Sequence, residues 1–232
     1  MGFLGLILVF AIILIVLAFV FDINLQNFKQ MKSIGEDKNL SKITDKLPSN
    51  IKVCKDILKK INNTKVEVEE NKDSFTSLYI AITDKIHIAN VKDSFTRIQT
   101  IAHECIHSIQ NRKILLFNFY YSNAYLFYFI SALIMLICKA MPYKNICISI
   151  FIMLSFVYYV VRTYLENDAM IKARYLAKEY IEEQEVLTKE EVNQVVNKYD
   201  ELNNIGVKWT NFNLFLGTVI KVIILLIICI IR

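Results

Sequence analysis

Four blocks of mostly apolar residues divide the chain into membrane-sized and polar segments. The blocks cover residues 3–21, 114–138, 145–165 and 213–231. A helix needs about 20 mostly apolar residues to cross the roughly 30 Å hydrocarbon core of a bilayer. Each block satisfies this requirement, so the pattern predicts a mainly α-helical integral membrane protein with about four transmembrane helices. Only residues 139–144 separate the second and third blocks, which predicts an antiparallel transmembrane hairpin.

The first apolar block resembles a secretory signal peptide in position but not in its flanking residues. No basic residue precedes it, and no pair of small residues with cleavage-site spacing occurs before Asp22. A signal peptide ordinarily has both features. We therefore interpret residues 3–21 as an uncleaved transmembrane anchor.

The first polar region, residues 22–113, has the patterns of a small α+β domain. Apolar residues at a spacing of three to four predict a helix over residues 51–61. Alternating apolar and β-branched residues predict two strands, 77–82 and 86–89, around a tight turn. A further helix is expected to begin near Asp93 or Ser94, and no proline or glycine interrupts residues 94–113.

The second polar region, residues 166–212, is predicted to form two helices. Thr188 and Glu191 have the spacing of a capping box, which marks the start of the second helix. The last apolar block, residues 213–231, then closes the chain.

Four spans place both polar regions on the same side of the membrane. Basic residues near the span ends favour that side as the cytoplasmic one, because positive charge is retained in the cytoplasm. The basic residues on the side of the polar regions are Lys29, Lys32, Arg97, Arg112, Lys113, Lys172, Arg174 and Lys208. The opposite side has only Lys139, Lys144 and Arg232. We expect a multi-pass protein of the cell membrane whose polar regions are cytoplasmic.

Composition narrows the classes of function. The chain is 55% hydrophobic with 5 Gly and 2 Pro, which excludes disordered and collagen-like proteins. Its net charge of +5 includes no run of more than two basic residues, so we expect the lipid bilayer, and no nucleic acid, as a partner. The five cysteines contain no C-x-x-C pair, which argues against a disulfide framework and against a cysteine zinc site.

One motif carries chemistry. His103 and His107 enclose Glu104 in an H-E-x-x-H sequence, and the chain has only one other histidine. Residues four apart lie on one face of a helix, so both imidazoles can bind one zinc ion. The glutamate between them can act as the general base for a zinc-activated water. A chance match on a surface helix is the alternative, and the scarcity of histidine argues against it.

A catalytic zinc commonly has three protein ligands, and Glu166 is the stronger candidate for the third. It lies at the edge of the apolar face of its predicted helix and directly follows a transmembrane block. The transmembrane hairpin returns it to the membrane surface that holds His107. The alternatives are that Glu166 only complements the helix dipole, or that His87 in a predicted strand is the third ligand.

These residues lie in two segments that resemble the bacterial membrane neutral zinc metallopeptidases of the YugP-like family. Residues 101–110 resemble the signature A-H-E-x-G-H-x-x-Q, and residues 166–173 resemble E-x-D-A-S-x-x-A. The order of anchor, strand pair, histidine helix, hairpin, glutamate helix and final span also agrees. Two residues depart from the family pattern, Ile106 in place of glycine and Met170 in place of serine.

The resemblance implies a small zincin-like H-E-x-x-H domain at the membrane surface. It implies His103, His107 and Glu166 as zinc ligands, Glu104 as the general base, and at most a supporting role for Asp168 outside the ligand set. We therefore expect a zinc metallopeptidase that cleaves a protein or peptide substrate. A non-catalytic membrane scaffold or assembly factor with a retained zinc site is the main alternative, and a metal-dependent hydrolase of a non-peptide bond is a weaker one.

Lys221 interrupts the last apolar block near its middle. A charge inside a span is a candidate functional residue. The alternatives are that its side chain extends toward the membrane surface or that the span is shifted along the sequence.

Overall fold

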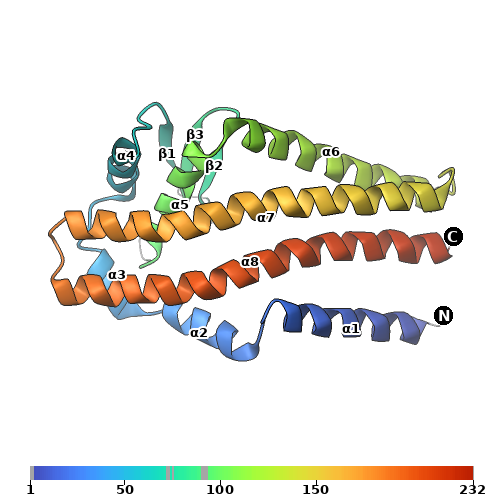
Figure 1. The fold of residues 1–232 in the computed structure, drawn as a ribbon, viewed down its shortest axis with the longest axis horizontal. Helices are drawn as coiled ribbons and strands as arrows, with labels where there is room; N and C mark the ends of the chain where they lie inside the picture. Colours follow the sequence, from blue (N-terminus) through green and yellow to red (C-terminus); the bar gives the residue numbers. More distant parts are fainter. Residues whose placement is uncertain (1–2, 72–73, 75, 90–93, 232) are drawn as a thin grey trace. The chain divides into compact units, whose positions relative to one another are not determined.

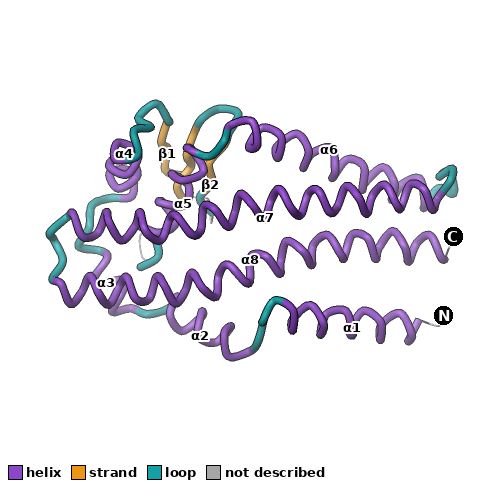
Figure 2. Tube along the Cα trace, in the orientation of Figure 1, coloured by secondary structure: helices purple, strands orange, loops and turns teal. Residues whose placement is uncertain are grey.

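The structure is a computed structural model that describes residues 3–71, 74, 76–89 and 94–231. It is mainly helical, with one small sheet (Figures 1 and 2). The helices are α1 (Phe3–Val20), α2 (Leu25–Gly35), α3 (Lys38–Thr44), α4 (Asn50–Lys60), α5 (Arg97–Ile109), α6 (Arg112–Ile137), α7 (Lys144–Glu183) and α8 (Lys189–Ile231). The strands are β1 (Glu67–Asn71), β2 (Leu78–Ile80) and β3 (Lys85–Ala89).

Three helices of the described chain, α6, α7 and α8, are long and apolar enough to cross a membrane. A fourth is reached only if α1 and α2 are counted together as one bent span. The length and apolar composition of these helices are consistent with a membrane protein. Residues 166–212 were predicted to form two helices. In the structure, these helices are the polar parts of α7 and α8, each of which is continuous with an apolar block.

The chain divides into two compact units, which are described separately. The first consists of Met1–Asn24, Lys113–Tyr164 and Lys208–Arg232 and contains the apolar blocks. Aromatic rings fill its interior: Tyr125 is stacked on Phe151, with ring centroids 5.1 Å apart, and on Tyr158, at 4.8 Å. The buried Ser155 hydroxyl donates to the Tyr125 hydroxyl at 3.2 Å.

The second unit consists of Leu25–Arg112 and Leu165–Val207 and contains the sheet. The strand order is β1-β3-β2, with β3 parallel to β1 and antiparallel to β2. The predicted pair of strands is therefore present as β2 and β3, and β1 joins them on the other side of β3. Helices α4 and α5 contact each other, and α5 contacts both β2 and β3.

Helix α5 is fixed in this unit by its apolar face. Ile98, Ile101, Ala102 and Cys105 have no exposed surface. The Cys105 thiol lies 3.6 Å from the Cys54 thiol of α4. This burial sets the rotation of α5 and directs the opposite face, which carries the two histidines, away from the core.

The start of α5 differs from the sequence prediction. The helix begins at Arg97, after the Thr96 N-cap, whereas a start near Asp93 or Ser94 was expected. Asp93 lies outside the described residues. Ser94 instead forms a turn in which its hydroxyl accepts the backbone N–H of Thr96 at 3.3 Å.

Arg97 was counted among the charges that favour a cytoplasmic orientation, but its side chain is buried. Its guanidinium donates to the Asn50 side chain and to three backbone carbonyls, those of Thr44, Leu47 and Pro48, at 2.7 to 3.0 Å. These bonds satisfy a charge that would otherwise be costly to bury. Arg97 thus holds the connection between α3 and α4, and it carries no weight in the orientation argument.

Within the second polar region, α8 begins at the predicted capping box. In the capping box, the Glu191 carboxylate accepts the Thr188 backbone N–H at 3.0 Å, and the Thr188 hydroxyl accepts the Glu191 N–H at 3.2 Å. The small residues Ala169, Ala173 and Ala177 of α7 are buried in the core of the second unit. They let the polar half of α7 approach its neighbours closely, and this fixes the position of Glu166.

Candidate metal centre

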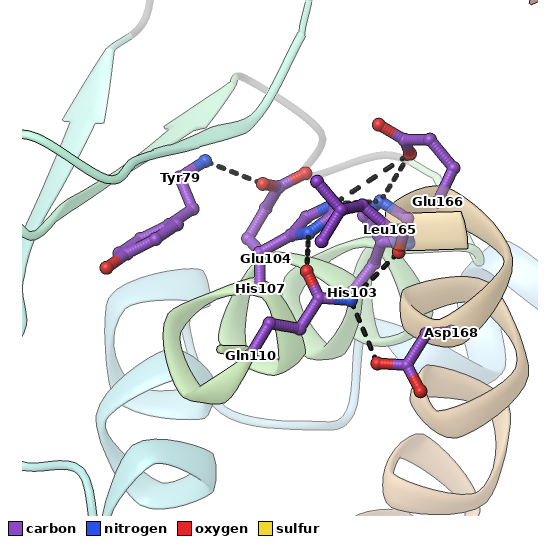
Figure 3. A network of polar contacts seen from close by, with 8 residues as sticks. All are labelled: Tyr79, His103, Glu104, His107, Gln110, Leu165, Glu166 and Asp168. Atoms are coloured by element: carbon purple, nitrogen blue, oxygen red, sulfur yellow. Dashed lines mark hydrogen bonds and ion pairs between the residues drawn. The ribbon is translucent and has the colours of Figure 1, made fainter. Parts of the chain in front are cut away.

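Three side chains from two helices of the second unit converge on one point (Figure 3). His103 and His107 come from successive turns of α5, and Glu166 comes from α7. Their nearest ligand atoms all lie within 4.8 Å of one another. The side chains are only 13% to 21% exposed, so the group is sheltered yet still reachable from outside.

The distances within the group fit a small tetrahedral ion. The two histidine Nε2 atoms are 3.0 Å apart, and the Glu166 Oε2 atom lies 3.4 Å from the first and 3.8 Å from the second. Ligands placed about 2.0 to 2.1 Å from a tetrahedral zinc are separated by roughly 3.3 Å. The three atoms therefore already have nearly the spacing that zinc requires, and two imidazole nitrogens with a carboxylate oxygen are ligands that it accepts.

Hydrogen bonds around Gln110 determine which nitrogen of His107 is free. The Gln110 amide group donates to the backbone carbonyl of Leu165 at 2.8 Å and to the Asp168 carboxylate at 2.9 Å (Figure 3). Both partners are acceptors, so the NH₂ end of the amide must face α7. The carbonyl end then accepts from His107 Nδ1, which is 2.8 Å away. Nδ1 therefore carries a proton, which leaves Nε2 as the nitrogen that faces Glu166 and is available to a metal.

Asp168 supports this arrangement as an ionised acceptor. Burial alone raises the pKa of its carboxyl, but hydrogen bonds from Lys172 and Gln110 outweigh that effect and hold the pKa below its ordinary value. Lys172 lies 2.6 Å from the second Asp168 oxygen. The predicted supporting role of Asp168 is thus reached through Gln110. Gln110 is the last residue of the segment that resembles the family signature, but the sequence alone predicts no role for it.

Glu104 lies next to the three-residue group and is itself buried. Its carboxylate accepts the backbone N–H of Tyr79 in β2 at 2.6 Å. Burial raises the pKa of Glu104, while the two histidines and the Tyr79 N–H act in the opposite direction. A carboxyl whose pKa is shifted upward is better suited to accept a proton than an ordinary surface glutamate.

The strand β2 brings a second feature to the site that the motif did not reveal. Among the described strands β2 is at an edge of the sheet, because only β3 pairs with it. Tyr79 is the middle residue of β2, and its N–H is bonded to Glu104 of α5. The outer edge of β2 therefore faces Glu104, which accepts the N–H of its middle residue.

His87 does not belong to the group. It lies in β3, with Nδ1 3.6 Å from the Glu69 carboxylate of β1. Of the two departures from the family pattern, Ile106 lies in the core and Met170 is partly exposed. Ile106 is buried, and the tip of Met170 lies 3.1 Å from where a side chain on Gly206 would begin. Gly206 thus provides the room for Met170.

Comparison with known proteins found no matching family model, no matching curated protein and no matching solved structure.

Proposed function

We propose that the chain is a membrane-bound zinc metallopeptidase of the YugP-like type, with a zincin-like domain that holds the metal through His103, His107 and Glu166. The observation that carries this proposal is the convergence of those three ligand atoms beside a buried fourth residue, Glu104. A site that only stabilises structure commonly has four protein ligands and no base. Three ligands and an adjacent glutamate are typical of hydrolytic sites.

When bound, zinc supplies a Lewis acid that polarises a carbonyl and lowers the pKa of water toward about 7. Glu104 is placed to take a proton from the attacking water and to deliver it to the leaving amine nitrogen. Gln110 holds His107 in the tautomer whose Nε2 is free, and Asp168 fixes the orientation of Gln110. The outer edge of β2 can align an extended peptide beside Glu104 by strand addition once Glu104 releases the Tyr79 N–H.

The alternative is a scaffold or assembly factor in which the metal has a structural role only. The hydrogen bond from Tyr79 to Glu104 favours it, because that bond gives the carboxylate a structural function of its own. A metal-dependent hydrolase that acts on a non-peptide bond is a weaker candidate, because none of the described residues specifically supports it.

One comparison separates these functions. Wild-type protein and Glu104→Gln are purified in detergent, and zinc content and cleavage of fluorescein-labelled casein are measured for both. The peptidase proposal expects about one zinc per chain in each, with cleavage reduced at least a hundredfold in the variant, as is typical for the loss of a general base. Full zinc content with no cleavage by either protein supports the scaffold.

We propose further that the protein crosses the cell membrane four times, with α1 as the first span, and that both polar regions are cytoplasmic. Seven exposed or partly exposed basic residues remain on that side once Arg97 is set aside, against three on the other. Labelling of a cysteine introduced at Glu190 in intact cells tests the orientation. Protection from an impermeant maleimide is expected, and efficient labelling would reverse the assignment.

A further inference from the structure

Lys221 places a charged group deep within the last apolar block. Along the helix, 8 residues separate it from Asn213 and 10 separate it from Ile231. At about 1.5 Å per residue, the nearer end of the block is roughly 12 Å away. That distance exceeds the reach of a four-carbon side chain. With the span at residues 213–231, the ammonium group therefore lies within the hydrocarbon region, and such a charge is expected to have a function.

The immediate surroundings of Lys221 provide only part of the hydrogen bonds and opposite charge that its ammonium group requires. Its Nζ donates to the backbone carbonyl of Gly217, one turn earlier on α8, at 3.2 Å. It also lies 5.6 Å from the ring centroid of Tyr125 on α6, within the range of a cation–π contact. An ammonium has three donors. In the part of the chain that the structure describes, it forms no ion pair with a carboxylate.

The apolar blocks of this sequence supply no negative charge for Lys221. The four apolar blocks contain two cations, Arg162 and Lys221, and no aspartate or glutamate. A second copy of the chain therefore brings no carboxylate to the depth of Lys221. The neutralising group must belong to another molecule.

Gly217 leaves room for such a molecule beside the ammonium. A Cβ atom built on Gly217 meets nothing within 4 Å, and the residue is partly exposed. Gly217 and Lys221 are four residues apart, so they share one face of α8. Glycine lets a second helix approach closely in a membrane. We propose that this Gly217–Lys221 face binds a transmembrane helix of a partner protein that carries an aspartate or glutamate at mid-span.

The chain offers a direct probe of this interaction. Trp209 is its only tryptophan, and it lies on α8, roughly 18 Å along the helix from Lys221. The full-length protein is reconstituted in phosphatidylcholine vesicles with dansyl-labelled leucine–alanine transmembrane peptides. The peptides differ in one mid-span residue, which is Asp, Asn or Leu. Energy transfer from Trp209 measures their binding.

We expect the Asp peptide to bind at least tenfold more tightly than the Leu and Asn peptides, and Lys221→Met to abolish that difference. The matched control is the double variant Ile220→Lys with Lys221→Ile, which keeps the charge at the same depth but turns it about 100° around the helix. It should also lose the preference, and because it retains the composition of α8 it guards against a folding defect of Lys221→Met.

Three results would overturn the inference. Equal binding of the three peptides would show that charge does not matter. Persistence of the preference in either variant would place the binding surface elsewhere. Loss of Asp-peptide binding when phosphatidylglycerol replaces part of the phosphatidylcholine would show that an anionic lipid headgroup reaches Lys221, and therefore that the residue does not lie at mid-span.

Discussion

The two helices that form the candidate metal centre are built on opposite principles. Helix α5 has 13 residues and contributes two ligands four positions apart. Helix α7 has 40 residues and contributes one ligand, Glu166, from near its middle. The first half of the site is specified by local spacing on one short helix, whereas the second half depends on where the fold places one carboxylate. The difference teaches that the spacing of α5 defines one face of the candidate metal centre, and that the packing of α7 completes it.

Gln110 connects these two halves. It follows the last residue of α5 and adopts an extended backbone conformation, with ψ at 163°, which ends the helix. Its side chain bonds His107 at one end and the backbone and Asp168 of α7 at the other. A rotation of either helix would break this bridge, so we expect the metal affinity to depend on it. The predictions below test each half and then the bridge.

The largest effect is expected for the α5 half. His107→Ala should weaken zinc binding roughly a thousandfold, because a total binding free energy of about 10 to 16 kcal/mol is shared among few ligands. Competition with a chromophoric chelator measures the affinity. His87→Ala is the control, since His87 lies beside Glu69, and it should change the affinity less than twofold. If the zinc affinity of His107→Ala is within tenfold of wild type, the assignment of the α5 half to the site is wrong.

The α7 half should show a smaller but still large effect. Glu166→Ala is expected to weaken zinc binding about a hundredfold, because water can replace a carboxylate oxygen more readily than an imidazole. Glu182→Ala on the same helix is the matched control, because its carboxylate is exposed and pairs only with Lys178. If the two variants bind zinc alike, α7 merely supports α5.

The sequence predicted the candidate residues of the two halves by different routes. The motif and the apolar face of α5 were sufficient to predict His103, His107 and Glu104. Glu166 was predicted from the return of the hairpin and from its place beside a small-residue face. Both predictions rested on regular helical periodicity, for which sequence signals are strong.

The parts that the sequence did not predict depend on tertiary contacts. Strand β1 contains only one apolar residue, Val68, so it lacks the alternation that marks a strand. No proline or glycine marks the end of α5 at Ile109. The helix ends there because Gln110 adopts an extended backbone and contacts α7. The hydrogen bond from Tyr79 to Glu104 involves a backbone N–H, which no side-chain pattern can reveal.

The bridge itself should have an intermediate effect. Gln110→Ala is expected to reduce zinc affinity about ten- to fiftyfold, the range found when a hydrogen-bond partner of a metal ligand is removed. Gln99→Ala is the control on the same helix, where the amide bonds Asn203 instead of the site. Equal affinities of the two variants would show that each half holds its ligands without the bridge.

The smallest effect is on stability, and it concerns Glu104. Burial raises its pKa, so at neutral pH the ionised carboxylate favours the unfolded chain. Glu104→Gln keeps an acceptor for Tyr79 and removes this penalty. With a chelator present at pH 8, its Tm should exceed that of wild type, on the scale of about 2 to 4 °C for each kcal/mol in a chain of this size.

The sign of that effect can be checked by pH. The penalty is present above the folded-state pKa and is lost as the pH falls through the ordinary value near 4.5, where the carboxyl is protonated in both states. The melting difference should therefore vanish near pH 4. A difference that grows on acidification would contradict the assigned direction.

X-ray absorption at the zinc edge on the purified, zinc-loaded protein tests the metal centre most directly. We expect one zinc per chain with only nitrogen and oxygen neighbours at about 2.0 to 2.1 Å, including the outer-shell scattering of two imidazoles. Loss of one nitrogen neighbour in His107→Ala and a changed oxygen shell in Glu166→Ala would complete the assignment. Sulfur neighbours near 2.3 Å, or a spectrum unchanged in both variants, would contradict a centre formed by His103, His107 and Glu166.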